Sequence, residues 1–250
     1  VPISPESSLR AFSDSARKPP QKRVQKLVGM ILWIARSYRA DLSYAASALG
    51  TRVSSWDAET ERELERCVAY IKATRALALT QKWKLGAEAE LRLYTDSDWR
   101  APKSQSGWAL VLEPKDQPPG VENKDCQILL GFGSKKQPFA ADSVAAAETI
   151  ACYFGIRETM FAPRAFNHAG ALRVFVDNSQ VVSLARNGHS ESLEFAHRAV
   201  NVRAACLKDA GRLGWTRVCK VPTRENRSNL MTKPVKASDL DRERRLLGLH

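Results

Sequence analysis

The hydrophobic period of this chain changes once, near residue 91, and this change limits the possible folds more than any other feature. Apolar residues recur at helical spacing over residues 24–35. Over residues 91–96 two kinds of side chain alternate instead, which is the period-two pattern of a strand. We therefore expect a small helical unit followed by a domain that is built on a sheet.

The rest of the chain divides by the same criteria. Prolines interrupt any period in residues 1–22, which we interpret as a flexible arm. Residues 23–80 are predicted to form the helical unit, and the polar stretch 81–90 a linker. Residues 91–250 are predicted to form an α/β domain with a mixed five-stranded sheet flanked by helices. Strands are expected at 91–96, 107–112, 128–132, 172–176 and 215–221, with helices at 23–36, 142–160, between 180 and 209, and at 238–247.

Two signals predict where helices end and begin in the helical unit. Gly50 is expected to stop a helix that starts near Asp41, because glycine is common just beyond a helix C-terminus. Another helix is expected after Ser55, because Asp57 and Glu59 would then lie in its first turn, where the helix dipole favours acidic residues. The unit should therefore contain three helices.

The charge of the chain is strongly positive. Its 39 Lys and Arg residues outnumber 27 Asp and Glu residues, which gives a formal net charge of +12. A basic excess of this size favours polyanionic partners, and nucleic acid is the commonest of these. The longest apolar run, residues 27–35, is well short of the ~20 residues that a membrane-spanning helix needs. We expect a nucleic-acid partner and no membrane.

The cysteines indicate the redox environment. There are five of them, an odd number, and they are scattered and form no CxxC pair. This distribution argues against a zinc ribbon and against a disulfide framework. The simpler inference is an intracellular, reducing compartment.

Three acidic residues occupy positions where this architecture would bring side chains together. Asp96 lies on the first strand and Asp177 directly after the fourth, and α/β sheets place their sites at strand ends. Glu148 lies on a helical stripe that should pack on the sheet. The other members of that stripe are Val144, Ala151 and Gly155. A buried carboxylate there needs a partner. Mg²⁺ or Mn²⁺ would serve, and two such ions ~4 Å apart promote phosphodiester hydrolysis.

Each of the three residues also has a simpler explanation. Asp96 could be a turn residue at a strand end, and Asp177 could cap the helix that follows it. Glu148 could pair with an Arg or a Lys. The metal hypothesis depends on all three residues occurring together, in these elements and in this order.

Five short motifs occur in order between residues 94 and 234. They are Tyr94–Trp99 with Lys103–Trp108 (YTDSDW and KSQSGW), Gly133–Pro138 (GSKKQP), Ala147–Ala151 (AETIA), Val176–Gln180 (VDNSQ) and Leu230–Pro234 (LMTKP). Together they resemble the ribonuclease H domain that ends the polyprotein of copia-type retrotransposons. The resemblance implies a metal-dependent endonuclease that cuts the RNA of RNA–DNA hybrids, with Asp96, Glu148 and Asp177 as catalytic metal ligands.

The helical unit resembles the segment that precedes this domain in the same polyproteins, the tail of the reverse transcriptase. The matching stretches are Lys26–Trp33, Arg39–Ala45 and Tyr70–Thr74. The paired-aspartate motif of the polymerase is absent from the chain. We therefore expect no polymerase activity.

The chain departs from the family pattern near the site. The family usually has a fourth carboxylate before the closing motif, and the matching residue here is Asn229, which can offer an oxygen but no charge. We expect Asn229 to lie beside the three carboxylates as a further catalytic residue. Basic side chains near the site are expected to hold the nucleic-acid backbone. The candidates are Arg100, Lys103, Lys135, Lys136, Arg224 and Lys233.

Three functions remain open on this evidence. The first is the nuclease, which intact Asp96, Glu148 and Asp177 favour. The second is an inactive or weakened module recruited as an RNA-binding component of a ribonucleoprotein, which Asn229 favours. The third is a transposon relic with neither role. The expected partners are an RNA–DNA hybrid or a structured RNA, within a larger polyprotein or a ribonucleoprotein.

Overall fold

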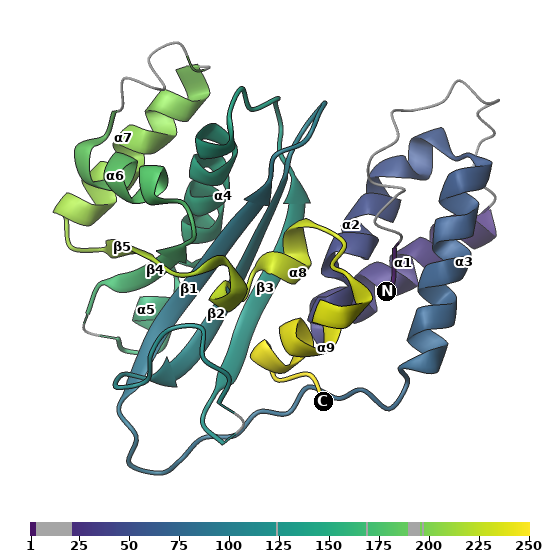
Figure 1. Cartoon of the computed structure of the whole chain (residues 1–250), viewed down its shortest axis with the longest axis horizontal. Coiled ribbons are helices and arrows are strands. Elements are labelled where there is room, and N and C mark those ends of the chain that lie inside the picture. Colours follow the sequence, from purple (N-terminus) through teal and green to yellow (C-terminus); the bar gives the residue numbers. More distant parts are fainter. Residues whose placement is uncertain (4–21, 124, 169, 190–195, 197) are drawn as a thin grey trace.

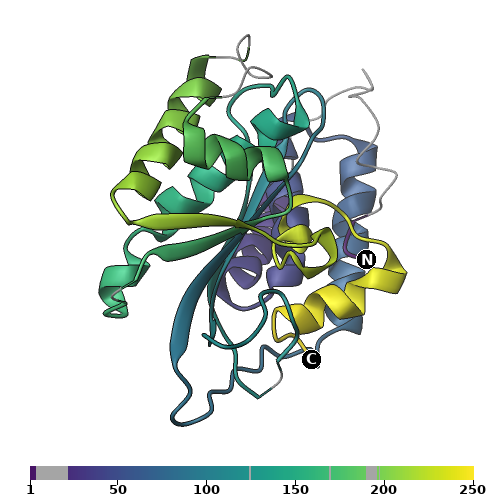
Figure 2. The same ribbon diagram turned by 60° about the vertical axis from the view of Figure 1, so that its left-hand side comes forward.

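The computed structural model describes residues 1–3, 22–123, 125–168, 170–189, 196 and 198–250, so most of the predicted flexible arm lies outside the described residues. The described residues form a five-stranded sheet in the order β3-β2-β1-β4-β5, with helices on both faces (Figure 1, Figure 2). The predicted α/β class and the mixed, ribonuclease-H-like sheet with a preceding helical unit are confirmed.

The sheet combines an antiparallel meander with two parallel strands. The meander consists of β1 (Ala89–Asp98), β2 (Gln105–Pro114) and β3 (Ile128–Lys136). β4 (Leu172–Val176) pairs in parallel with β1, and β5 (Thr216–Lys220) in parallel with β4. Parallel pairing requires crossover connections, and the helices that separate β3, β4 and β5 in the chain supply them.

β3 extends beyond the end that the sequence predicts, to Lys136 instead of residue 132. Gly131 and Gly133 interrupt the alternation of side chains that is typical of a strand. Glycine is needed at both positions because the Trp108 indole lies against them. A Cβ at Gly133 would lie 2.5 Å from Nε1 of Trp108, and one at Gly131 would lie 3.3 Å from the same ring. The motif that begins at Gly133 therefore continues a strand, and it pairs with the start of β2.

One face of the sheet is covered by α4 (Val144–Thr159), α6 (Ser179–Asn187) and α7 (Arg198–Arg212) (Figure 1). α4 packs on β1 and β2, and it shares a hydrophobic core with Leu91, Leu93 and Val174 of the sheet. The helical structure expected between residues 180 and 209 consists of two helices, α6 and α7. Residues 190–195 and 197, which separate them, lie outside the described part of the chain.

The opposite face is covered by the helical unit and by the C-terminal helices (Figure 2). These are α1 (Lys22–Ser37), α2 (Ser43–Arg52), α3 (Ala58–Ala73), α8 (Asn229–Thr232) and α9 (Ala237–Leu246). Tyr94 and Val111 of the sheet share one core with Ile31 and Leu49 of the helical unit. β1 is consequently buried on both faces, although its sequence alternates as in a half-exposed strand.

Shorter elements connect the main ones. They are η1 (Ala40–Leu42), η2 (Val53–Ser55), α5 (Ala162–Ala165) and η4 (Thr223–Glu225). α2 continues past Gly50 to Arg52, so the predicted stop is wrong. Gly50 lacks the positive φ of a glycine cap. The next helix begins after Ser55 as expected, because Asp57 caps it by accepting a hydrogen bond from the Thr60 N–H at 2.7 Å.

The helical unit is tied to the C-terminus of the chain. Ala78 and His250 exchange two backbone hydrogen bonds, at 2.9 and 3.0 Å. Buried Asp41 binds Arg39 at 2.8 Å and accepts a hydrogen bond from the Tyr70 hydroxyl at 2.6 Å. Arg244 of α9 also donates to that hydroxyl. The predicted boundaries between arm, helical unit, linker and sheet domain stay predictions.

Two further expectations concern the redox state of the cysteines and the presence of membrane-spanning helices. All five cysteines are free, and Cys67, Cys126 and Cys152 are buried. Within the described residues, none of the helices combines the length and the apolar character needed to cross a bilayer. The reducing compartment itself stays a prediction.

Candidate active site

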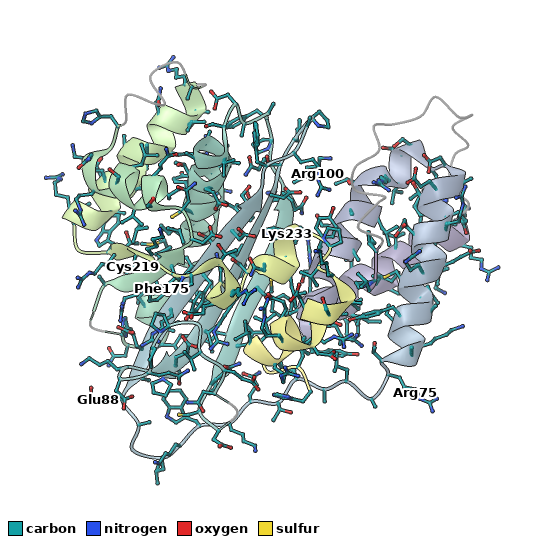
Figure 3. All side chains as sticks on the ribbon, viewed as in Figure 1. Arg75, Glu88, Arg100, Phe175, Cys219 and Lys233 are labelled. Atoms are coloured by element: carbon teal, nitrogen blue, oxygen red, sulfur yellow. The ribbon has the colours of Figure 1, made fainter. Side chains whose placement is uncertain are left out.

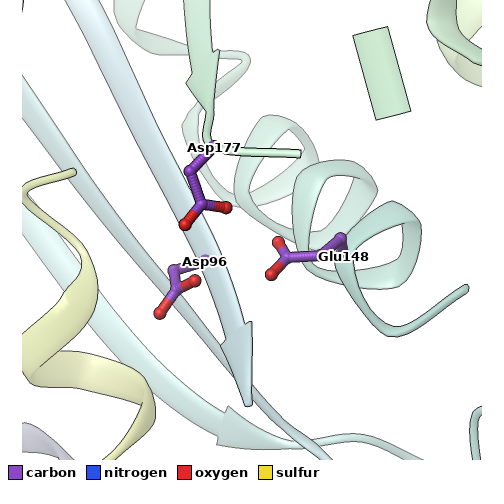
Figure 4. A group of neighbouring side chains, drawn as sticks. All are labelled: Asp96, Glu148 and Asp177. Atoms are coloured by element: carbon purple, nitrogen blue, oxygen red, sulfur yellow. The ribbon is translucent and has the colours of Figure 1, made fainter. Parts of the chain in front are cut away.

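The register of the parallel strands brings Asp96 and Asp177 to the same edge of the sheet. Tyr94 of β1 is the partner of Phe175 of β4. Asp96 and Asp177 each follow two residues later, and parallel strands end at a common edge, so the two carboxylates become neighbours. Figure 4 shows both side chains directed to one point at this edge.

The third carboxylate is positioned by the close packing of α4 on the sheet. Gly155 allows this approach, because a Cβ there would lie 2.6 Å from Cγ2 of Thr95 and 3.2 Å from Cβ of Trp108. Glu148 lies two turns earlier on the same stripe, and Ala151 between them is fully buried. Val144 differs from the expectation, since it is exposed at the first turn of the helix.

The three carboxylates form a compact cluster. One oxygen atom from each of Asp96, Glu148 and Asp177 can be chosen so that all three lie within 4.8 Å of one another. Asp96 is 1% exposed and Glu148 is 3% exposed, while Asp177 is half-buried. The cluster therefore opens to solvent on the side of Asp177.

Two of the simpler explanations do not hold. Asn178, and not Asp177, caps α6 by accepting a hydrogen bond from the Gln180 N–H at 2.9 Å. Oε2 of Glu148 is buried and has no hydrogen-bond partner among the described residues. Leaving a buried carboxylate oxygen without a partner is unfavourable, so the cluster has the property expected of a ligand site.

The electrostatics of the cluster favour a bound cation. Burial raises the pKa of Glu148 well above its usual range, and the charges of Asp96 and Asp177 raise it further. Burial also raises the pKa of Asp96, against the opposing effect of Lys233. A divalent cation beside these oxygens would stabilise their charged forms in place of protons. An all-oxygen donor set with one unsatisfied buried oxygen fits Mg²⁺ or Mn²⁺.

Lys233, which the sequence predicts as a nucleic-acid-binding residue near the site, lies in the acidic cluster itself. Its Nζ is 3.6 Å from Oδ2 of Asp96, and Figure 3 shows it beside α8. The Asp96 carboxylate raises the pKa of Lys233. The preceding residue, Thr232, donates a hydrogen bond from its hydroxyl to the same Asp96 oxygen. Sequence reasoning did not assign a site role to Thr232.

Asn229 is linked to the cluster through its backbone. Its carbonyl oxygen lies 3.1 Å from Oγ1 of Thr232, the residue that contacts Asp96. Its amide donates to the Thr223 carbonyl at 2.8 Å and approaches Oε1 of Glu243 at 3.5 Å. Oδ1 of Asn229 is buried without a hydrogen-bond partner among the described residues. Glu243 of α9 is thus a further buried acid, in addition to the three carboxylates of the cluster, and it lies beside Asn229. The sequence motifs did not reveal it.

The remaining basic candidates differ in how they are held. Arg100 pairs with Asp98 at 3.3 Å and Lys103 donates to the Pro138 carbonyl at 2.7 Å, so both are held by nearby groups. Lys135 is exposed on β3, and Lys136 is half-buried, which lowers its pKa. Arg224 is exposed in η4. These positions give the chain several cations at the surface, and Lys135 and Lys136 also line a cavity.

That cavity lies between β3, α4 and α7 and has a volume of about 140 Å³. Besides Lys135 and Lys136 it is lined by Arg157 and Arg203. Aromatic rings hold two of these cations, since Lys135 lies 5.2 Å from the centre of the Phe154 ring and Arg203 lies 5.4 Å from that of Tyr153. A cavity lined by four cations can bind a phosphate group. Arg157 and Arg203 were not among the sequence candidates.

The order and directions of the five strands define the class of this protein, a ribonuclease-H-like α/β domain, and the acidic cluster lies at its strand ends. No family model matches the chain. It is similar to ribonuclease H1 of the halophilic archaeon Halobacterium salinarum, at 16% identity over 57% of this chain and 94% of that one, with a TM-score of 0.38. A ribonuclease H1 isolated from compost matches at 15% identity over 61% of this chain and 96% of that one, with a TM-score of 0.40.

A longer but weaker similarity includes the helical unit. The protease–reverse transcriptase of prototype foamy virus matches over 92% of this chain and 29% of the viral chain, at 8% identity and a TM-score of 0.35. The fold is assigned from the order and direction of the five strands, which do not depend on these matches.

Proposed function

We propose that this chain is a metal-dependent endonuclease that cleaves the RNA strand of RNA–DNA hybrids. The observation that carries the proposal is the cluster of Asp96, Glu148 and Asp177, with its unsatisfied buried Glu148 oxygen, at the strand ends of a ribonuclease-H-like sheet. The motifs support an origin in a copia-type retrotransposon polyprotein. We also propose an intracellular, reducing compartment, because the cysteines are odd in number and scattered, which argues against a disulfide framework.

The side chains of the site have different roles in the proposed hydrolysis. Asp96, Glu148 and Asp177 would hold Mg²⁺ or Mn²⁺, which activates water and stabilises the leaving oxygen when bound. In the hydrolysis the water oxygen would form the new bond to phosphorus, one bridging P–O bond of the RNA would break, and the released ribose oxygen would leave as a hydroxyl that carries the water proton. Thr232 fixes the orientation of Asp96 through its hydrogen bond. The open side at Asp177 admits the scissile phosphate, while the cations around the cavity hold the backbone of the duplex.

The proposal is tested by cleavage of a labelled RNA–DNA hybrid with Mg²⁺ or Mn²⁺ titrated from zero. We expect cleavage of the RNA strand that requires the metal, and no cleavage of the DNA strand. The Asp177→Asn variant serves as the inactive control. Wild-type and control proteins that are equally inert over the whole metal range would rule out the nuclease.

Hybrid binding should weaken steeply as salt increases, because Lys and Arg side chains displace counterions from phosphates. The slope of log affinity against log salt is negative. Replacing Lys135 and Arg157 together by Ala should make it shallower by about 1 to 2, at roughly 0.9 per lost phosphate contact. Fluorescence anisotropy without divalent metal over a KCl series measures this slope.

Lys115→Ala is the control for this series. Lys115 is exposed and pairs with Glu88 at 3.2 Å, and Glu88 lies at the opposite end of the sheet from Lys233 (Figure 3). We expect its slope to equal that of the wild type. A double variant whose slope is also unchanged would place the hybrid elsewhere on the protein.

A second candidate function is a binding module in a ribonucleoprotein, with catalysis weakened or lost. Asn229 favours it, because the neutral amide supplies no charge for a metal where the family usually has a carboxylate. The ion pair of Lys233 with Asp96 favours it as well. Under this proposal the salt-dependent binding is kept, while the metal-dependent cleavage is absent. A relic that has lost both roles would show neither property.

Replacing Asn229 by Asp should lower the Mn²⁺ concentration needed for half-maximal cleavage, because it adds a negative charge near the cluster. The new carboxylate would face Glu243, whose pKa is already raised by burial. We therefore combine Asn229→Asp with Glu243→Gln and use Glu243→Gln alone as the matched control. The Mn²⁺ dependence of hybrid cleavage is the measurement. Equal Mn²⁺ requirements in the two variants would show that Asn229 has no part in metal binding.

A further inference from the structure

Lys233 places a positive charge inside the acidic cluster. Its Nζ lies 3.6 Å from Oδ2 of Asp96, and the charges of Asp177 and Glu148 also act on it. When ionised, the three carboxylates carry three formal negative charges, and Lys233 supplies one positive charge. One divalent cation would complete the balance. Two divalent cations would leave an excess of two positive charges.

The backbone that carries Lys233 is held firmly against the sheet. Gly107 of β2 allows α8 to approach, because a Cβ there would lie 2.6 Å from Cβ of Met231 and 2.7 Å from Cγ2 of Thr232. Ser134 of β3 donates a hydrogen bond to the Met231 carbonyl, and Thr232 donates one to Asp96. Lys233 is the next residue in the chain, so its side chain starts at the rim of the cluster.

The accessibility of the side chain matches a role in the site. The Lys233 side chain is 40% exposed, whereas that of Asp96 is 2% exposed. The ammonium group thus meets the carboxylates at the boundary between the protein and solvent, where a substrate phosphate would approach. A charge fixed there acts on an anionic substrate as well as on the metal ligands.

We propose that Lys233 is a tethered cation that takes the place of a second divalent ion, so that the centre binds a single Mg²⁺ or Mn²⁺. The proposal deepens the proposed nuclease function and depends on it for the identity of the reaction. The neutral Asn229 agrees with it, because the residue that matches the family's fourth carboxylate brings no negative charge to offset a second divalent ion. Lys233 would neutralise part of the negative charge of the three carboxylates permanently, independent of the metal concentration.

The test is calorimetric titration of Mn²⁺ into the metal-free full chain, without nucleic acid. We expect the wild type to bind one Mn²⁺. Lys233→Met should bind Mn²⁺ about tenfold more tightly, because a positive charge beside the Asp96 carboxylate is removed. Lys233→Arg keeps the charge and should stay within about twofold of the wild type. Hybrid cleavage at saturating Mn²⁺ should fall at least about tenfold in Lys233→Met.

Lys236→Met is the matched control, because Lys236 is an exposed lysine three residues further along the chain, at the N-terminus of α9. Its Mn²⁺ affinity should equal that of the wild type. Thermal unfolding of every variant checks that the fold is retained. The wild-type Mn²⁺ affinity in Lys233→Met, or two Mn²⁺ ions bound to the wild type, would overturn the tethered cation.

The two proposals fail in different ways. A wild type that cleaves hybrids while Lys233→Met binds Mn²⁺ with unchanged affinity keeps the nuclease and removes the tethered cation. A wild type that is inert on hybrids, with tighter Mn²⁺ binding in Lys233→Met, removes the nuclease and supports the tethered cation. Absence of Mn²⁺ binding in both proteins overturns the tethered cation and the metal centre together.

Discussion

Replacing Asp177 by Asn is expected to reduce cleavage of the RNA strand of a hybrid by about a thousandfold or more. The metal contributes several kcal/mol of transition-state stabilisation, and each 1.36 kcal/mol is worth a factor of ten in rate. The substitution keeps the size of the side chain and removes one of three charges in a cluster that already lacks a fourth. The loss should therefore not be compensated within the site.

Asp177 is the most informative of the three carboxylates to change. Asp96 also pairs with Lys233 and accepts a hydrogen bond from Thr232, so its replacement would disturb the docking of α8 as well. Glu148 is packed in α4 against the sheet. Asp177 is half-buried at the open side of the cluster, and it does not cap α6. Its substitution should therefore change the charge of the site with little effect on the fold.

The measurements are single-turnover cleavage of a labelled hybrid and Mn²⁺ binding by calorimetry. Asp116→Asn is the control, because Asp116 is an exposed residue in the turn after β2. We expect wild-type cleavage and Mn²⁺ affinity for this control, and loss of both in Asp177→Asn. If Asp177→Asn retains wild-type cleavage, the acidic cluster is not the catalytic centre.

Replacing Glu113 by Gln is expected to destabilise the fold by about 3–5 kcal/mol, the usual loss when one member of a buried ion pair is removed. Glu113, on β2, is fully buried and pairs with Arg92 at 3.5 Å and with Arg227. Tyr94, whose pKa is raised by burial so that its hydroxyl stays protonated, donates a hydrogen bond to Glu113 at 2.7 Å. Gln would leave two buried guanidinium groups near a neutral side chain.

Thermal unfolding measures this effect. At roughly 2–4 °C for each kcal/mol in a domain of this size, the midpoint should fall by about 6–20 °C. Glu88→Gln is the matched control, because Glu88 precedes β1 and forms an exposed pair with Lys115 at 3.2 Å. A surface pair of this kind contributes about 0–1 kcal/mol. Equal midpoints for the two variants would show that the buried network contributes no more than a surface ion pair.

The buried network joins β1, β2 and the segment between β5 and α8. Arg92 lies on the face of β1 that the sequence pattern leaves polar, and Arg227 comes from the segment between β5 and α8. Both are fully buried. A substitution in this network should therefore weaken the contacts of β1 and β2 with the segment that leads to α8.

The order of the elements and the choice of the three carboxylates as candidate metal ligands could be predicted from the amino-acid sequence. Hydrophobic period is a local property, so the strand at 172–176 and the helix around Glu148 could be predicted from neighbouring residues alone. Asp57 at the start of α3 is equally local, because a helix cap acts on the next few residues. The proximity of Asp96 and Asp177 could be predicted before the structure was known, because parallel strands end at a common edge of the sheet.

The partners of each residue across the sheet could not be predicted from the sequence, because they depend on how the strands and helices pack in three dimensions. Burial of Arg92 depends on the helices that cover the second face of β1, and its partner Glu113 lies on another strand. Extension of β3 through Gly133 depends on the Trp108 ring beside it. Lys233 enters the acidic cluster because Gly107 and Thr232 dock α8 on the sheet. These contacts join residues far apart in the chain, and no local pattern of side chains records them.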